Sequence, residues 1–121
     1  MAHSLEAAAQ ECVAVFDTAF FKALCEPARI AVLRELILLG CADIGTIAER
    51  LPQDRSVIAR HLQQLAAADI VTAERDGRRV VYQINVSAVA TRLEAILATT
   101  RLLEGAMAEA CPLRLQPARF D

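Results

Sequence analysis

Residues 51–65, with the sequence LPQDRSVIARHLQQL, constrain the fold of this chain more than any other segment. Pro52 ends the preceding helix, because the residue before a proline is pushed out of the helical region. Farther on, Ile58, Leu62 and Leu65 fall at i, i+4 and i+7. This spacing predicts a helix that buries one apolar stripe and turns its other face to solvent.

The outer face of this helix has the chemistry of a base-reading surface. It carries no acidic residue from 55 to 64, and its members are Arg55, Ser56, Ala59, Arg60 and Gln63. In the major groove of DNA, arginine can pair with guanine and glutamine with adenine, whereas phosphate repels acids. A solvated amphipathic helix has the same pattern, so the neighbouring segments decide between the two interpretations.

A short helix is predicted just upstream, over residues 43–51. Asp43 can cap it, and one of its faces is apolar: Ile44, Ile47, Ala48 and Leu51. Asp54 can cap the helix that follows. Two short helices joined by a tight turn form a helix-turn-helix unit.

A β-hairpin is predicted directly after this unit. Residues 71–75 and 79–84 are β-prone runs on either side of Asp76-Gly77, and an Asp-Gly turn between such runs is a strong hairpin signal. Arg75, Arg78 and Arg79 cluster at its tip. A hairpin with a cationic tip is a wing that can lie along a phosphate backbone. The three features together favour DNA binding over a merely solvated helix.

Further helices are predicted toward the N-terminus. Ser4 can cap a helix that runs to about Leu24, with one apolar face: Val13, Phe16, Phe20 and Leu24. Pro27 suits the first turn of the next helix, which continues through Ile30, Leu33 and Ile37. Gly40, a usual terminator, ends it.

A last helix is predicted from about Ser87 to Ala110. Its apolar positions recur at alternating spacings of three and four residues: Val86, Val89, Leu93, Ile96, Thr100, Leu103 and Met107. Such a narrow seam is typical of two paired helices, and packing on the chain's own core is the alternative. We favour a homodimer seam, formed by Val89, Leu93, Ile96, Leu103 and Met107, because a small core leaves little room for so long a helix.

The predicted fold is therefore mainly α with a small β-hairpin, in the order α-α-α-α-β-β-α. One domain is expected over residues 1–111, and a loosely ordered tail over 112–121, which holds two prolines.

Composition narrows the function. The net charge is −2. Of the three segments 1–53, 54–83 and 84–121, only residues 54–83, with 5 bases and 4 acids, have a positive net charge. DNA affinity should therefore depend on a few placed arginines. No membrane span or signal peptide is visible, so cytoplasmic residence is expected. No acid/base pair, phosphate loop or activated nucleophile suggests an enzyme. The four cysteines do not resemble a secreted disulfide framework, and are expected to be thiols.

The chain resembles the ArsR/SmtB family of bacterial transcriptional repressors. Matching segments lie at family spacing over residues 21–33, 47–51, 56–65, 69–71 and 75–82, and include Lys-Ala-Leu-x-x-Pro-x-Arg, Arg-His-Leu and Asp-Gly-Arg…Tyr. The resemblance implies a winged helix-turn-helix homodimer paired through its first and last helices. It also implies a repressor that leaves its operator when an effector binds.

The chain departs from the family pattern at several positions. Val57 and Ala59 stand where the family often has hydroxyl residues, which leaves apolar contact in the recognition helix. Residues 43–46 read Asp-Ile-Gly-Thr instead of the family's Cys-x-Cys-Asp metalloid motif. No histidine follows His61, so the family's zinc site in the last helix is absent too.

The cysteines remain as effector candidates. Some relatives build an arsenic site from an N-terminal cysteine and one near this junction, so Cys12 and Cys41 are a candidate pair. Others place thiols at the end of the last helix, as at Cys111. Soft thiolates favour trivalent arsenic and similar ions. Each cysteine can equally be a small buried hydrophobe, and this alternative is strongest for Cys25.

We expect a homodimeric repressor that binds a double-stranded DNA operator and needs no cofactor. The expected DNA contacts are Arg55, Ser56, Arg60, His61, Gln63, Arg75, Arg78 and Arg79, with His61 either structural or touching phosphate. The first effector hypothesis is a thiol switch at Cys12, Cys41 and Cys111 that senses a metalloid or an oxidant. The alternatives are the same fold answering to an organic ligand or partner protein, and a winged-helix protein-interaction module that no longer binds DNA.

Overall fold

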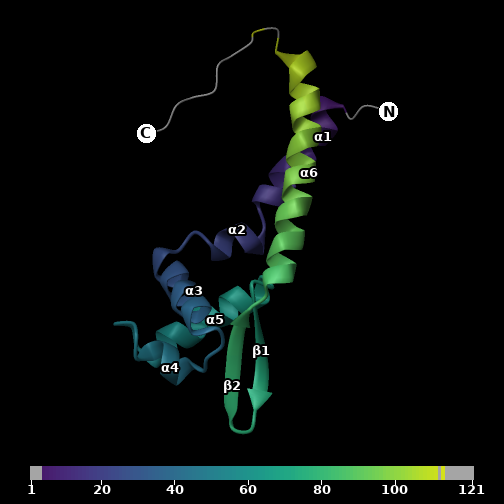
Figure 1. Ribbon diagram of the computed structural model, residues 1–121. Helices are drawn as coiled ribbons and strands as arrows, with labels where there is room; N and C mark the ends of the chain where they lie inside the picture. The colour runs from purple at the N-terminus through teal and green to yellow at the C-terminus, as the bar shows by residue number, and fades with distance from the viewer. Residues whose placement is uncertain (1–3, 112, 114–121) are drawn as a thin grey trace. The chain divides into compact units, whose positions relative to one another are not determined.

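The computed structural model describes residues 4–111 and 113, which form helices and one antiparallel hairpin (Figure 1). In chain order the elements are α1 (Leu5–Phe16), α2 (Ala19–Ala23), α3 (Pro27–Leu39), α4 (Ile44–Ala48), α5 (Arg55–Ala67), β1 (Val71–Asp76), β2 (Arg79–Ile84) and α6 (Val86–Ala110). The chain divides into two compact units. One runs from Asp17 to Leu93, and the other holds the described parts of Met1–Phe16 and Glu94–Asp121. No helix in the described part of the chain is long and apolar enough to cross a membrane.

The N-terminal segment forms two helices where one was predicted. Ser4 Oγ accepts a hydrogen bond from the Ala7 amide at 3.1 Å, as expected of a cap. However, α1 ends at Phe16, and Thr18 is extended, with φ −124° and ψ 160°. The predicted continuous apolar face is therefore wrong, because Val13 and Phe16 lie on α1, Phe20 lies on α2, and Leu24 follows α2. The β-branched Thr18 is well suited to this extended position between the helices.

Helix α3 has the predicted limits but a different buried face. Pro27 occupies its first turn, and Gly40 ends it with a positive φ of 83°, a conformation that glycine adopts without strain. Its buried side chains are Val32, Leu33 and Leu36. Ile30 and Ile37, which the sequence placed along the apolar path of the helix, are exposed.

The helix-turn-helix consists of α4 and α5. Ile58, Leu62 and Leu65 on α5 are fully buried, which confirms the predicted stripe. Helix α5 contacts α2, α3, α4 and β1, so it lies at the centre of the core of this unit. The largest fully buried side chains are Val32, Leu36, Ile47, Ile58, Leu62, Leu65 and Ile70.

The two caps of the helix-turn-helix differ. Asp43 caps α4 as predicted, by accepting a hydrogen bond from the Thr46 amide at 2.8 Å. Asp54 occupies the N-cap position of α5, but its side chain makes no capping hydrogen bond. The predicted capping role of Asp54 is therefore wrong, although the helix does begin at the next residue.

The wing is the hairpin of β1 and β2, paired in register from Val71 with Ile84 to Asp76 with Arg79. Because Asp76 pairs with Arg79, the turn consists of Gly77 and Arg78, one residue later than predicted. Gly77 takes a φ of 64°, which suits the first position of a tight hairpin turn.

The base of the wing is joined to the segment between α3 and α4. The Ala42 amide donates to the Tyr82 carbonyl at 3.0 Å, and the Tyr82 amide donates to the Ala42 carbonyl at 2.8 Å. The orientation of the hairpin therefore depends on the short segment that enters α4.

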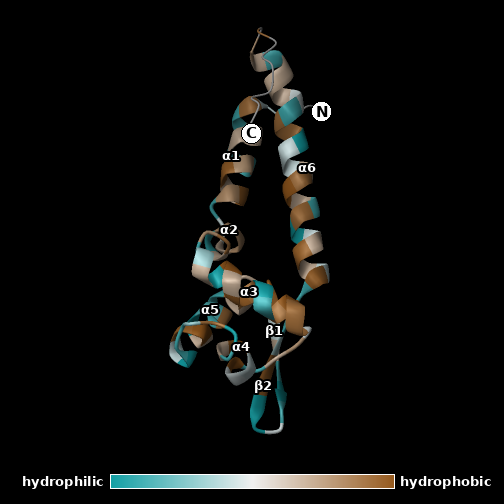
Figure 2. Ribbon diagram, turned by 60° about the vertical axis from the view of Figure 1, so that its left-hand side comes forward, coloured by the Kyte–Doolittle hydropathy of each residue, from teal (hydrophilic) through white to brown (hydrophobic). Residues whose placement is uncertain are grey.

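Helix α6 begins within one residue of the prediction, and the Asn85 side chain caps it by accepting from the Ala88 amide at 3.2 Å. No residue of α6 is buried in the single chain. Leu93 and Met107 are 50% and 46% exposed, while Val89, Ile96 and Leu103 are half-buried. Apolar residues recur along the length of α6 (Figure 2). The predicted seam thus retains much apolar surface that a partner could cover.

Two expectations about domain organisation are not tested. The tail over residues 112–121 lies outside the described residues, apart from Leu113. The expectation of a single domain over residues 1–111 stays a prediction.

Candidate nucleic-acid interface

The outward face of α5 carries the side chains predicted to read bases. Arg55, Ser56, Arg60 and Gln63 are all exposed, and Ala59 is half-buried. Ser56, Arg60 and Gln63 fall at i, i+4 and i+7, so they share one face of the helix. The opposite stripe is fully buried, which fixes the rotation of α5 and keeps this face in solvent.

His61 does not belong to this exposed surface, and its burial favours the structural role over the contact with phosphate, which stays a prediction. Its side chain is only 8% exposed, and its Nδ1 atom has no hydrogen-bond partner among the described residues. His61 comes one residue before Leu62 and three after Ile58, so it widens the buried stripe. Burial lowers the pKa of His61, and the charge of the nearby Arg29 lowers it further.

Arg29 joins three helices behind the reading face. Its guanidinium Nη1 donates to the Lys22 and Ala23 carbonyls at 3.3 and 3.1 Å, and Nη2 donates to the Gln64 side chain. It thereby satisfies carbonyls at the end of α2 and connects α3 to α5. Sequence reasoning assigned no role to Arg29, although it is the arginine of the Lys-Ala-Leu-x-x-Pro-x-Arg motif.

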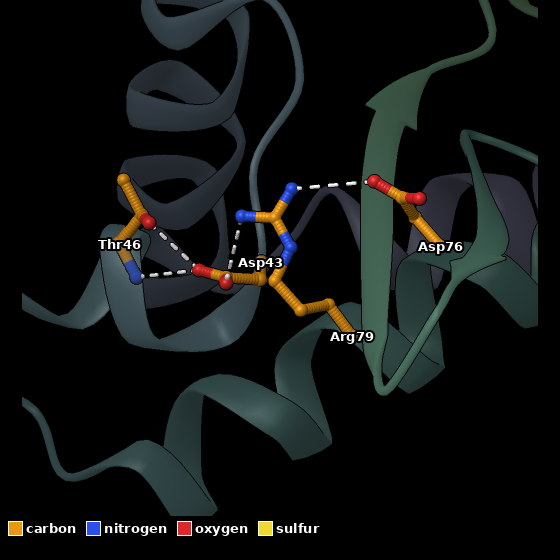
Figure 3. Close-up of polar contacts among 4 residues, drawn as sticks. All are labelled: Asp43, Thr46, Asp76 and Arg79. Carbon is orange, nitrogen blue, oxygen red and sulfur yellow. Dashed lines mark hydrogen bonds and ion pairs between the residues drawn. The ribbon is translucent and has the colours of Figure 1, made fainter.

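The three wing arginines are exposed but differ in their partners. Arg79 lies 3.5 Å from a carboxylate oxygen of Asp76 and 3.5 Å from one of Asp43 (Figure 3). Within the described part of the chain, Arg75 and Arg78 make no ion pair. These two are therefore the cations of the wing that remain available to an external anion.

The carboxylate of Asp43 contacts both Thr46 on α4 and Arg79 on the wing. Its Oδ1 accepts from the Thr46 amide at 2.8 Å and from the Thr46 hydroxyl at 2.7 Å. Hydrogen bonds from the Thr46 hydroxyl and amide hold the pKa of Asp43 below its usual value. Burial opposes this shift, and the charges of Arg79 and then Arg55 lower the pKa further. Asp43 is therefore ionised at neutral pH.

Arg55 lies over the first turn of α4. A Cβ added to Gly45 would come within 3.3 Å of Arg55 Nη2, so the glycine leaves the space that this guanidinium occupies. Arg55 also lines an open hollow of about 490 Å³ with Arg78 and Arg79, where Asp43 and Glu49 supply the opposite charge. The hollow is bounded by α4, the start of α5 and the wing.

Comparisons with known proteins point to one type of regulator. No family model matches the chain. NolR of Rhizobium meliloti, a nodulation protein, is 29% identical over 77 residues, which are 64% of this chain and 62% of NolR. An ArsR-like transcriptional regulator from Rhodococcus sp. RHA1 is 24% identical, with a TM-score of 0.67 over 84% of this chain and 90% of that one. AntR, an antimony-specific transcriptional repressor, is 25% identical, with a TM-score of 0.53 over 83% of each chain.

The chain has the winged-helix fold of these ArsR-like regulators. Its match covers only about three fifths of the length of the curated relative NolR. The Rhodococcus protein is a transcriptional regulator and AntR is a transcriptional repressor.

The four thiols of the chain differ in accessibility. Cys25 and Cys41 are exposed, Cys111 is half-buried, and Cys12 is buried. Cys41 precedes Ala42, the residue bonded to the base of the wing, and lines a second hollow with Glu74 and Asp76. Among the described residues, no group of three or more His, Cys, Asp or Glu side chains is arranged to hold a metal ion. The predicted thiol pairings therefore stay predictions.

Proposed function

We propose that this ArsR-type protein is a transcriptional repressor that binds an operator in double-stranded DNA as a homodimer. The observation that carries the proposal is the anchored helix α5, whose outward Ser56, Arg60 and Gln63 lie on one face and whose inward stripe is fully buried. A helix presented in this way can enter the major groove, which is wide enough to admit it.

The side chains divide into base readers and phosphate binders. Arg60 can donate two hydrogen bonds to guanine, and Gln63 can pair with adenine. Arg75 and Arg78 are exposed cations of the wing that make no ion pair within the described chain, so they suit backbone phosphates. Phosphate contacts set the register on the duplex, and base contacts supply the sequence preference.

The acidic balance of the chain limits how it can bind. With a net charge of −2, the protein lacks the broad cationic surface of a general DNA binder. Affinity must come from a few arginines, so we expect a small dependence on salt, in proportion to the few phosphates neutralised.

The homodimer is supported by the apolar seam of α6. Leu93 and Met107 remain about half exposed in the single chain, and the other seam residues are only half-buried. A two-fold dimer would present two copies of α5 to two half-sites about one helical turn apart.

The direct experiment is selection from a randomised duplex library, followed by a mobility shift with the selected sequence. The proposal expects a two-fold symmetric sequence bound in preference to unselected DNA of the same length. If the protein binds no duplex above background at low salt, the repressor proposal is wrong. The alternative of a protein-interaction module that does not bind DNA is then favoured.

For the effector, we propose a thiophilic ion, such as trivalent arsenic or antimony, acting through cysteines. The similarity to AntR, an antimony-specific repressor, supports this choice. Cys41 is the best placed thiol, because it is exposed and its neighbour Ala42 is hydrogen-bonded to the wing. Thiols lose their protons when they bind such an ion. A movement of Cys41 on binding the ion would shift its neighbour Ala42, and with it the base of the wing.

The effector test compares single Cys→Ser variants on the selected duplex. Trivalent arsenic should release the wild type, and release should weaken in Cys41→Ser and in a variant of Cys12 or Cys111. Cys25→Ser is the matched control, because Cys25 is equally exposed but lies outside the proposed set. A triple variant of Cys12, Cys41 and Cys111 that responds like the wild type would exclude the thiol switch.

A further inference from the structure

Asp43 uses its two carboxylate oxygens for different partners. Oδ1 accepts both hydrogen bonds from Thr46, which caps α4, while Oδ2 lies 3.5 Å from Nη1 of Arg79 on the wing (Figure 3). The capping role therefore leaves one oxygen for an ion pair with the hairpin.

The ion pair is the second of two links between the wing and the segment that enters α4. The first is the pair of backbone hydrogen bonds between Ala42 and Tyr82, at the residue just before Asp43. Tyr82 and Arg79 are three residues apart on β2, so the hairpin is held at two separated points. One attachment point alone would leave the hairpin free to pivot, whereas two restrict that motion.

Arg79 also connects Asp43 to the other strand. Its Nη2 lies 3.5 Å from Oδ2 of Asp76, the last residue of β1. The guanidinium therefore bridges a carboxylate on the wing and a carboxylate at α4. An arginine held between two carboxylates in this way is poorly available to phosphate.

The recognition helix is tied to the same place. The guanidinium of Arg55, at the first residue of α5, occupies the space left by Gly45 and acts electrostatically on Asp43. Asp43 is thus flanked by one arginine from the wing and one from the recognition helix.

We propose that Asp43 is a positioning residue for DNA binding, which holds the wing through Arg79 so that Arg75 and Arg78 meet phosphate while α5 lies in the groove. This inference rests on the proposed function and adds a role that the sequence patterns did not assign. The effect proposed for Asp43 is opposite to the usual one, because an acid near a phosphate backbone normally weakens DNA binding. Here its removal weakens binding instead.

Asp43→Asn is the informative substitution. Asparagine keeps a side-chain oxygen to cap α4, and it removes the charge that holds Arg79. We expect the affinity for the selected duplex to fall about tenfold, the scale of losing one well-placed phosphate contact. Glu49→Gln is the matched control, because Glu49 lines the same hollow but makes no ion pair within the described chain. The control should bind as tightly as the wild type, or slightly more tightly.

A double-mutant cycle separates positioning from simple loss of charge. Arg79→Gln should weaken binding as Asp43→Asn does, and the double variant should lose no more than the larger single loss. Losses that simply add in the double variant would overturn the proposal. The proposal is also overturned if Asp43→Asn binds the duplex as tightly as the wild type or more tightly.

Hydrogen exchange of the free protein supplies a readout that needs no DNA. Asp43→Asn should raise amide exchange in the part of β1 and β2 next to the turn, while exchange in the buried parts of α3 and α5 stays unchanged. Unchanged exchange in the wing would refute the positioning role even if the wild type bound no duplex. In a further outcome, the wild type binds no duplex while Asp43→Asn still raises exchange in the wing. That result would refute the repressor proposal but support the ion pair between Asp43 and Arg79 as a link that holds the wing.

Discussion

The guanidinium of Arg55 fills the space beside Gly45, where an added Cβ would come within 3.3 Å of Nη2. This close contact would be with the far end of a flexible side chain, so a small movement of Arg55 can accommodate Gly45→Ala. Alanine also favours the helix by about 1 kcal/mol over glycine. We therefore expect the stability of Gly45→Ala to stay within about 1 kcal/mol of the wild type.

The same substitution should nevertheless weaken operator binding, because it pushes the guanidinium of Arg55 away from α4 by a few tenths of an ångström. Arg55→Ala should cost about 1 kcal/mol or more of binding free energy, as for a charged contact to DNA. Gly45→Ala should reproduce part of that loss. Fluorescence anisotropy with the selected duplex measures both, and wild-type affinity in Gly45→Ala would show that the position of Arg55 does not matter.

The stability of the protein should fall at mildly acidic pH because of His61. The folded state lowers the pKa of His61 below its ordinary value of 6.5, through burial and the charge of Arg29. The unfolded chain then takes up a proton that the folded chain resists, so stability is full above about pH 6.5 and falls as the pH drops below it. Urea unfolding at pH 7.5 and 5.5 should show the loss in the wild type and a smaller one in His61→Gln. An equal loss in both proteins would remove His61 from the explanation.

Arg78 should contribute to affinity but not to sequence preference. It lies in the turn of the wing and makes no ion pair within the described chain, which suits a phosphate contact. Arg78→Ala should weaken binding to selected and unselected duplexes by the same factor, and reduce the slope of log affinity against log salt by about one. A loss confined to the selected duplex would mean that Arg78 reads bases.

The α6 seam makes a clear prediction about assembly. Leu93 is half exposed in the single chain, so Leu93→Asp should be tolerated by a monomer, but it would bury an unpaired charge in a dimer. Sedimentation should then show monomer or aggregate, with operator binding lost. Ala98→Asp, at an exposed position on the opposite side of the same helix, is the control and should remain dimeric. A wild type that sediments as a folded monomer at micromolar concentration contradicts the seam.

Local patterns predicted much of the fold because their causes are local. The stripe of Ile58, Leu62 and Leu65 follows from helical periodicity, and the end of α3 and the start of α4 follow from Gly40 and Asp43. The predicted end of the second of these helices at Leu51 is wrong, because α4 ends at Ala48. The wing followed from two β-prone runs around a glycine, although strand pairing moved its turn by one residue.

The errors arose where the deciding interaction is distant in the sequence. Periodicity alone continued the N-terminal helix to about Leu24, whereas α1 ends at Phe16 and Thr18 is extended. The burial of His61, which stands between Arg60 and Leu62, was likewise not predicted by the local pattern. The ion pair of Arg79 with Asp43 joins β2 to the residue that caps α4, with α5 and β1 between them in the sequence, so local patterns did not predict it. Such pairings depend on tertiary packing, which local propensity does not encode.

The central claim is that the outward face of α5 reads DNA bases, and Arg60 tests it most directly. Arg60→Ala should be assayed on the selected duplex and on variants with each base pair replaced in turn. We expect a loss of about 1–3 kcal/mol of binding free energy, together with relaxed preference at one base pair in each half-site and unchanged preference elsewhere. Unchanged operator affinity and preference in Arg60→Ala would contradict the assignment of α5 as the recognition helix.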